Sequence, residues 1–410
     1  MSGRAADSAE AVFREEWGRL LATLVRWVGD LDLAEEVAAE AIAVALERWP
    51  VDGVPDNPAG WLLTTARRRA VDLLRRRQTY AAKLAILRVE AERAETEPFD
   101  APAGDPDVIG DDRLRLFFTC CHPALAAEAR VALTLRYLAG LSTAEVARAF
   151  LVPDTTMAQR LVRAKRKIRE AGIPYRVPSA DELPTRLPAV LSVVYVVFTE
   201  AYAASHGPAL IRPELADEAI RLGRILHRLL PAEREVAGLL ALMLLTEARR
   251  SARFVDDALV ALGDQDRTTW DRALIAEGHA LVRECLARNQ PGHYQLMAAI
   301  NAVHTDAATA DATDWGQVAT LYNQLYAVSP TPVVALNRSI AIAELDGPAV
   351  GLALLEPLQL TGYHPWHAAR ADLLRRLDRF DEARAAYDAA IQASGNLAER
   401  AWLAERRDRL

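Results

Sequence analysis

Apolar residues recur along most of the chain at intervals of three and four positions, the period of an amphipathic helix. Gly and Pro gather between these runs, as in the loop PVDGVPD that separates the second predicted helix from the third. The apolar faces of the first three predicted helices are Phe13, Trp17, Leu20, Leu21, Leu24 and Val28, then Leu33, Val37, Ala41 and Val44, then Trp61, Leu62, Ala66, Ala70 and Leu74. Asn57 is expected to cap the third helix, and Pro58 to occupy its first position. The pattern predicts an all-α protein.

The periodic runs form three blocks. The first covers residues 8–80 and the second residues 113–173, and the Pro- and Gly-containing stretch 81–112 between them is predicted to be an acidic linker. Residues 90–112 alone hold nine carboxylates and one arginine. A Pro-rich boundary, GIPYRVPSADELP, precedes the third block, which covers residues 186–410. A chain of 410 residues is long enough for about two or three domains, each with its own core.

Composition limits where the protein works. The longest apolar run, LPAVLSVVYVVF at 187–198, has twelve residues and is too short to cross a bilayer. The N-terminal residues contain no apolar signal core. Three cysteines cannot form a disulfide framework, which is typical of a reducing compartment. We therefore expect a cytoplasmic protein without a membrane segment.

The net charge of −7 conceals a segregation of positive from negative charge along the chain. The second predicted helix carries a row of acidic residues, whereas the third carries arginine triplets at 67–69 and 75–77. Residues 160–167 contain five cations and no carboxylate. Alternating blocks of charge indicate that different surfaces contact different partners.

Residues 141–168, LSTAEVARAFLVPDTTMAQRLVRAKRKI, have the pattern of a helix-turn-helix. Ser142 and Glu145 have the spacing of a capping box at the start of the first helix. The inward side chains of that helix are expected to be Ala144, Ala147 and Phe150. LVPD supplies the turn, and Asp154 is expected to cap the second helix.

The second helix of this motif has two opposed faces. The apolar face consists of Met157, Leu161, Ala164 and Ile168. The opposite face presents Thr156, Arg160, Arg163 and Lys167, with Gln159 and Arg166 at its edge. Such a helix fits the major groove of DNA, where Arg pairs with guanine, Gln with adenine and the remaining cations with phosphates. A basic helix end that faces only solvent is the alternative, but the cap, the turn and the opposed faces together favour DNA binding.

The first two blocks resemble the sigma-70 family, in the family's order. FREEWGRLLATLVRWVGDLDLAEEVAAEAIAVALERWP followed by NPAGWLLTTARRRAVDLLRRR resembles region 2, and RVALTLRYLAGLSTAEVARAFLVPDTTMAQRLVRAKRKIRE resembles region 4. No segment resembling region 3 lies between them and nothing precedes region 2, as in the extracytoplasmic-function (ECF) group. The resemblance covers residues 1–173 and implies an RNA polymerase sigma factor, which initiates transcription. Residues 174–410 resemble the extension of an ECF subgroup with C-terminal TPR-like helices.

The resemblance implies a role for each charged surface. The second helix would dock on basic groups of core RNA polymerase through Asp32, Glu35, Glu36 and Glu40. The third helix would face the −10 element of promoter DNA with Asn57, Trp61, Arg67, Arg68, Arg69, Arg75 and Arg76, although helical phase alone favours a core position for Trp61. Region 4 would read the −35 element through Thr155, Thr156, Gln159, Arg160, Arg163 and Lys167.

No motif indicates catalysis, and promoter melting requires no covalent chemistry, so we predict no catalytic residue and no cofactor. Adjacent cysteines in CCHP at 120–123 point about 100° apart on a helix, and no second Cys/His pair lies nearby. Buried, unreactive thiols are therefore favoured over a metal site there. His364 and His367 lack a third ligand within reach in sequence. The chain has no GxxxxGK[ST] phosphate loop and no HExxH helix.

The C-terminal block is predicted to be TPR-like over residues 315–410. The residues with the spacing of a TPR helix pair are Ala371, Leu374, Ala383, Tyr387 and Ala390. The polar last helix, LAERAWLAERRDRL, suits a cap. We expect this extension to regulate the sigma regions in cis through an intramolecular contact; a purely stabilising appendage is the alternative.

Two other functions account for parts of the pattern. A non-sigma helix-turn-helix regulator with a TPR-like effector domain would bind operator DNA without polymerase, but it would need neither the acidic nor the arginine-rich helix of region 2. A TPR scaffold with an incidental basic helix would leave the capped, two-faced helix unexplained.

Overall fold

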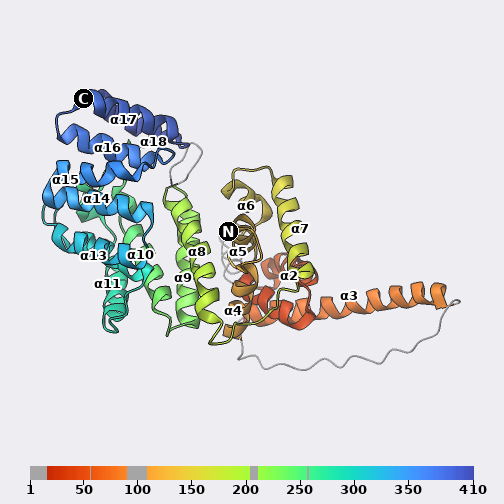
Figure 1. The fold of residues 1–410 in the computed structure, drawn as a ribbon. Coiled ribbons are helices and arrows are strands. Elements are labelled where there is room, and N and C mark those ends of the chain that lie inside the picture. The colour runs from red at the N-terminus through yellow and green to blue at the C-terminus, as the bar shows by residue number, and fades with distance from the viewer. Residues whose placement is uncertain (1–15, 56, 90–108, 204–210, 256–257) are drawn as a thin grey trace. The chain divides into compact units, whose positions relative to one another are not determined.

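The structure is a computed structural model that describes residues 16–55, 57–89, 109–203, 211–255 and 258–410, without the side chains of 76–89, 109–111, 255 and 258. The chain divides into two compact units, Met1–Val193 and Val194–Leu410 (Figure 1). The division falls within one long helix, α8 (Leu183–Tyr202).

Helices form almost all of the regular structure in these residues. In the first unit, residues 16–28 are helical and are followed by α2 (Leu31–Asp52), α3 (Pro58–Val89), α4 (Ile109–Cys120), α5 (Ala127–Tyr137), α6 (Thr143–Ala149) and α7 (Asp154–Glu170). The α-helices of the second unit are α9 (Pro213–Leu229), α10 (Arg234–Glu247), α11 (Arg272–Leu286), α12 (His293–Asp306), α13 (Trp315–Val328), α14 (Pro332–Asp346), α15 (Pro348–Leu355), α16 (His364–Arg376), α17 (Phe380–Ala393) and α18 (Leu397–Asp408). Its shorter elements are the 3-10 turns Arg250–Ala252, Leu262–Asp264, Arg267–Thr269 and Glu356–Leu358, and the antiparallel two-residue strands β1 (Phe254–Val255) and β2 (Ala258–Leu259). The predicted all-α class is confirmed.

Side-chain caps define where α2 and α3 begin. Asp30 Oδ1 accepts a hydrogen bond from the backbone N–H of Leu33 at 2.8 Å, at the start of α2. Asn57 Oδ1 accepts one from the backbone N–H of Gly60 at 2.9 Å, and Pro58 is the first residue of α3. The cap and the first helical position predicted for α3 are therefore both correct.

The end of α2 lies later than the loop PVDGVPD predicts. The helix continues through Pro50 to Asp52 and stops at Gly53, which has a φ of 83°. The backbone N–H of Gly53 donates to the carbonyl of Trp49 at 3.0 Å. Gly adopts this left-handed conformation without steric cost, so the glycine ends the helix.

The apolar faces predicted for the first three helices form the core of that part of the chain. The fully buried members are Trp17, Leu20, Leu21, Leu24, Leu33, Val37, Ala41, Leu62, Ala66 and Ala70. Val28, Val44 and Trp61 are half-buried, and Phe13 lies outside the described residues. Leu74 is exposed, contrary to the prediction. The C-terminal part of α3 extends away from the other helices of the first unit (Figure 1).

The predicted helix-turn-helix consists of α6 and α7, which pack against each other. The capping box is confirmed: the N–H of Ser142 donates to Glu145 Oε2 at 2.7 Å, and the N–H of Glu145 donates to Ser142 Oγ at 3.2 Å. The predicted cap at Asp154 is wrong. Pro153, with extended backbone, occupies the N-cap position, and Asp154 is the first residue of α7. A carboxylate there is still favourable, because it faces the positive end of the helix dipole.

Packing inside the motif follows the predicted faces closely. Met157, Leu161 and Ala164 are buried, and Ile168 is half-buried near the end of α7. In α6 the buried residues are Val146 and Ala147. The inward positions predicted for Ala144 and Phe150 are only partly correct, since both residues are half-buried.

In the second unit, helices that follow one another in sequence also pack against one another, from α9 to α18. This nearest-neighbour packing is typical of helical repeat proteins. The side chains that carry the predicted TPR spacing are all buried: Ala371, Leu374, Ala383, Tyr387 and Ala390. These residues belong to one hydrophobic cluster, which also includes Leu403 of α18.

The helix α8 has 20 residues, so it extends beyond the twelve-residue apolar run that the sequence shows. By length and composition alone, this whole helix could cross a membrane. The buried residues of α8 are Leu187, Val190, Leu191, Val193, Val194, Val197, Phe198 and Ala201, and all except Val193 recur at helical spacing. Such a stripe is typical of a helix that packs on protein.

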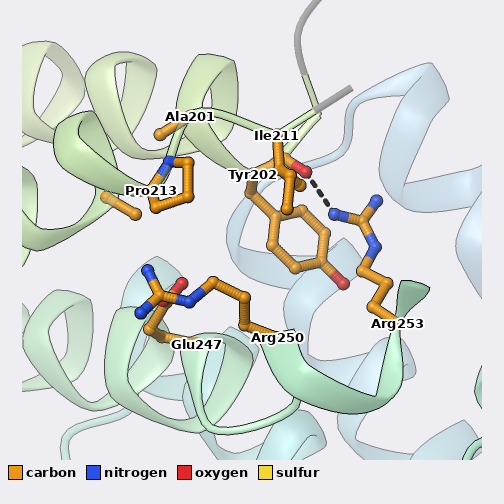
Figure 2. A pocket seen from close by; sticks show the side chains of 8 residues that line it. Ala201, Tyr202, Ile211, Pro213, Glu247, Arg250 and Arg253 are labelled. Carbon is orange, nitrogen blue, oxygen red and sulfur yellow. Dashed lines mark hydrogen bonds and ion pairs between the residues drawn. The ribbon is translucent and has the colours of Figure 1, made fainter. Parts of the chain in front are cut away.

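A small pocket lies in the second unit (Figure 2). Its walls are Ala201, Tyr202, Ile211, Pro213, Ala216, Glu247, Arg250 and Arg253. Arg253 donates to the backbone carbonyl of Tyr202, and its guanidinium carbon lies 3.5 Å from the centre of the tyrosine ring. The buried Glu247 pairs with Arg250 at 2.7 Å. Burial raises the pKa of Glu247 to about 7, although Arg250 opposes the shift.

Replacing Glu247 with Gln should remove a pH dependence from stability. Between pH 4.5 and about 7 the folded protein holds a proton that the unfolded chain releases, so stability falls as the pH rises across this range and then levels off. At pH 8 the Gln variant should therefore be more stable than the parent by about 1–3 kcal/mol, and at pH 5 the two should be nearly equal. Urea unfolding at both pH values measures this. Glu214→Gln, at an exposed glutamate of α9, should show no such difference.

Candidate DNA-binding and docking surfaces

The predicted recognition face of α7 is accessible. Thr155, Gln159, Arg163 and Lys167 are exposed, and Thr156 and Arg160 are half-buried. Arg160 lies 3.7 Å from Glu128 of α5, which partly neutralises its charge. Arg163 Nε donates to the backbone carbonyl of Gln159 at 3.3 Å and leaves the rest of its guanidinium in solvent. The face therefore presents a hydroxyl, an amide and cationic groups side by side.

The arginine triplets lie along α3. Arg68, Arg69 and Arg75 are exposed and Arg67 is half-buried. Arg69 lies 3.8 Å from Glu40 of α2, so this cation is close to the predicted docking row. The side chains of Arg76 and Arg77 lie outside the described residues.

Asn57 and Trp61 occupy the start of α3. Asn57 is exposed, but its side-chain oxygen is used as the helix cap, which leaves the amide nitrogen as the free donor. Trp61 is half-buried, and its ring meets that of Trp49 edge to face, with 5.6 Å between ring centres. The core position that helical phase favours for Trp61 is therefore only partly correct, since part of the residue is accessible.

The four residues of the acidic row on α2 differ in environment. Glu36 is exposed, Glu40 is half-buried beside Arg69, and the Asp32 side chain is 47% exposed. Glu35 is the most covered, with 20% of its side chain exposed. The row is thus accessible at Glu36 and largely covered at Glu35.

Region 4 supplies the groups that cover Glu35. Arg136 Nη2 donates to Glu35 Oε1 at 2.7 Å, and the Tyr137 hydroxyl donates to Oε2 at 2.9 Å. Lys165 Nζ donates to Glu35 Oε2 at 3.1 Å and lies 2.5 Å from Asp32 Oδ1. Arg169 lies 3.7 Å from Asp32. We call these six residues, Asp32, Glu35, Arg136, Tyr137, Lys165 and Arg169, the Glu35 cluster.

Protonation states in the Glu35 cluster follow from its geometry. Burial raises the pKa of Tyr137, and the neighbouring Glu35 carboxylate raises it further, so the hydroxyl stays a donor. Burial alone would lower the pKa of Lys165, but hydrogen bonds to Asp32 and Glu35 raise it overall. Lys165 therefore stays protonated at neutral pH, opposite the carboxyl groups of Asp32 and Glu35.

Three further residue pairs join the N-terminal helices to the segment that begins with α4. Trp17 Nε1 donates to the backbone carbonyl of Arg136 at 3.1 Å, and the Arg136 guanidinium lies over the Trp17 ring at 5.1 Å. The Tyr175 hydroxyl donates to the backbone carbonyl of Ala22 at 2.6 Å. Arg26 lies 3.5 Å from Asp112 of α4.

Sequence reasoning assigns no role to the basic members of the Glu35 cluster or to Tyr175. One signal for Lys165 is present in the sequence. Lys165 follows Leu161 by four positions, so it lies at the edge of the apolar stripe of α7 and away from the recognition face. Nothing in the sequence indicates that Tyr137 would reach Glu35, because the two residues are far apart along the chain.

The cysteine and histidine pairs have protein partners. Cys120 and Cys121 are buried, and burial raises the pKa of Cys121 to about 11. His364 Nδ1 lies 3.3 Å from Glu399, and His367 Nε2 lies 2.8 Å from the Thr361 carbonyl. Among the described residues, no group of three or more His, Cys, Asp or Glu could hold a metal ion.

Family models match three segments of the chain. Sigma-70 region 2 matches residues 12–80, and Sigma-70, region 4 matches residues 118–168. A family of unknown function (DUF6596) matches residues 186–286. No solved structure matches the chain.

Curated relatives agree with these matches. An uncharacterized protein of Rhizobium meliloti, R00370, is 42% identical over 393 residues, which cover 95% of this chain and 93% of the relative. The ECF RNA polymerase sigma factor SigK of Mycobacterium tuberculosis is 31% identical over 174 residues, which cover 40% of this chain and 88% of SigK. The probable ECF RNA polymerase sigma factor SigI of the same species is 28% identical over 185 residues, which cover 44% of this chain and 61% of SigI. The chain belongs to the ECF RNA polymerase sigma factors of the sigma-70 family and carries a C-terminal extension that matches the family of unknown function.

Proposed function

We propose that this sigma factor docks on core RNA polymerase through the acidic row of α2 and recognises the −10 and −35 promoter elements through α3 and α7. Sigma factors act with core polymerase on promoter DNA, and the proposal gives these two partners surfaces of opposite charge. Polymerisation belongs to the core enzyme, so the role requires no catalytic residue or cofactor in this chain. The role places the protein in the cytoplasm, with α8 packed on protein rather than in a membrane.

The recognition face of α7 is the observation that carries the proposal. One side of this helix is buried at Met157, Leu161 and Ala164, whereas the opposite side is open to solvent. The capping box fixes α6, which supports α7 as the first helix of a helix-turn-helix. The residues proposed to read the −35 element are Thr155, Thr156, Gln159, Arg160, Arg163 and Lys167. Of these, Gln159 and Arg163 are the exposed side chains with bidentate capacity for bases.

The first part of α3 is the proposed −10 surface. Its exposed arginines Arg68, Arg69 and Arg75 suit DNA phosphates, and we assign Arg67 and Arg76 to the same surface. The accessible part of Trp61 offers a stacking surface for an unstacked base, with the Asn57 amide nearby as a donor. Removing a base from the stack costs a few kcal/mol, which such contacts offset.

The acidic row is the proposed docking surface for core polymerase. Asp32, Glu35, Glu36 and Glu40 suit a basic partner, and Asp32 and Glu36 are the exposed members of the row. An operator-binding regulator would require only α6 and α7, so the match of residues 12–80 to region 2 supports the sigma role instead.

We further propose that the C-terminal extension regulates the sigma regions in cis. Its helices pack as neighbours in sequence, which favours a repeat surface that can bind a protein segment. We propose domain limits of 8–80 for region 2, 81–112 for the linker, 113–173 for region 4 and 186–410 for the extension, with TPR-like repeats over 315–410. The helix α3 continues into the proposed linker as far as Val89, and α4 begins within it at Ile109.

Replacing Arg163 with Ala should weaken binding to −35 duplex DNA by about 10- to 100-fold, because a bidentate base contact contributes about 1–3 kcal/mol. Promoters are first identified by run-off transcription of genomic fragments with the reconstituted holoenzyme, and affinity is then measured by fluorescence anisotropy. Arg148→Ala, an exposed arginine of α6, removes the same charge outside the recognition face. Equal losses for the two variants would contradict the assignment.

Replacing Glu36 with Gln should weaken the binding of core polymerase by about two- to fivefold, the effect of one exposed charge pair. Titration of labelled sigma factor with core enzyme at two salt concentrations measures this effect, which should shrink at high salt. Glu47→Gln removes an exposed carboxylate from the other end of α2 and should leave binding unchanged. A result in which both variants behave alike would count against docking through the row.

A chain that ends after Glu182 should differ from the full chain in promoter-specific transcription if the extension regulates in cis. This end point retains the hydrogen bond from Tyr175 to Ala22, which a chain ending at Gly172 would lose. It also retains the ion pair of Glu182 with Arg176. Transcription by the two chains with the same core enzyme measures the difference, and equal activity would remove the regulatory role.

A further inference from the structure

Part of the proposed docking row is already bound within the chain. Three donors from region 4 reach the Glu35 carboxylate: Arg136 at 2.7 Å, Tyr137 at 2.9 Å and Lys165 at 3.1 Å. Lys165 and Arg169 also meet Asp32. An ionised carboxylate accepts about four hydrogen bonds, so Glu35 has little capacity left for another cation.

The basic members of the Glu35 cluster supply the same cationic hydrogen-bond donors that a basic docking partner would supply to the acidic row. Arg136 and Lys165 present 16% and 15% of their side chains to solvent, so both cations are committed to the contact. Tyr137 is 1% exposed, and its hydroxyl is directed at Glu35 from within the core of region 4. A second protein could not reach Glu35 along the same directions while these groups are in place.

We propose that region 4 and core RNA polymerase compete for Asp32 and Glu35, so that the free protein is held in a closed form that opens before polymerase docks. The proposal rests on the docking role of the acidic row given above. In the closed form, this chain's own helices α5 and α7 contact Asp32 and Glu35. A basic surface of core polymerase displaces them when it docks.

The closed form leaves the −35 surface open. Lys165 and Arg169 lie one turn apart on a flank of α7, between the apolar stripe and the recognition face. Gln159 and Arg163 remain exposed while that flank contacts α2. Closure therefore restrains docking on polymerase without covering the residues proposed to read duplex DNA.

The contacts of the Glu35 cluster are weak enough for core polymerase to displace. Asp32 and Arg169 are 47% and 64% exposed, and ion pairs of this kind are weak and screened by salt. The Glu35 hydrogen bonds are more covered and carry most of the closure. If the open form is about one tenth of the free protein, closure reduces the apparent affinity for core polymerase about tenfold.

The test compares full-length Lys165→Met with Arg148→Met in binding to core polymerase without DNA. Each variant removes one cation from region 4, but Arg148 is exposed on α6 and lies outside the Glu35 cluster. Lys165→Met should bind core enzyme about fivefold to tenfold more tightly than the parent, and Arg148→Met should match the parent. Tyr137→Phe, which keeps charge and volume, should tighten binding by about two- to fivefold.

Carbodiimide labelling of carboxylates, read by mass spectrometry, reports closure directly. In the free parent Glu35 should be labelled much less than its exposed neighbour Glu36, and Lys165→Met should bring the two closer together. Equal labelling in the parent, or unchanged core binding by Lys165→Met and Tyr137→Phe, would overturn the proposal. Failure of the docking role is separate, because it appears as a Glu36→Gln variant that binds core enzyme normally.

Discussion

One helix, α7, has to satisfy three environments around its circumference, and the organisation of the first unit depends on this constraint. Met157, Leu161 and Ala164 fill the core of region 4, and the recognition face points to solvent. Lys165 and Arg169 take the remaining flank and contact α2. With 3.6 residues per turn, the circumference of a helix of this length has room for three such sectors. The sector in which a residue lies decides whether its side chain must be apolar, suited to DNA or suited to the carboxylates of α2.

The Glu35 carboxylate is where these sectors connect to region 2. A partly buried carboxylate is costly unless it is paired and hydrogen-bonded. Here a guanidinium, an ammonium and a tyrosine hydroxyl share the two oxygens. Removing any one of these three donors would leave the negative charge of Glu35 less well compensated. The contact therefore requires this particular arrangement of α2 against α5 and α7. About 20% of the Glu35 side chain is exposed, so solvent still reaches the carboxylate.

Most of the fold could be predicted from the sequence, because local rules decide it. The period of apolar residues located the helices, and caps such as Ser142 with Glu145 and Asn57 with Pro58 marked their starts. Boundaries were less predictable: α2 passes through Pro50 and ends only at Gly53, although a proline after the first turn costs a helix one backbone hydrogen bond. The accessible recognition face of α7 followed from phase alone. The Glu35 cluster did not, because it depends on tertiary contacts between residues that are distant in sequence, such as Tyr137 and Glu35.

The segregated charge of the chain explains how a protein with a net charge of −7 can keep a face for DNA. An acidic protein risks pairing its DNA-binding cations with its own carboxylates. Here Asp32 and Glu35 engage Lys165 and Arg169 on the flank of α7, and Glu40 approaches Arg69 on α3. Gln159 and Arg163 are left exposed, whereas Arg160, which does pair with Glu128, is half-buried. Opposite charges therefore meet inside the chain at positions that spare the centre of the recognition face, and the net charge predicts little about either surface.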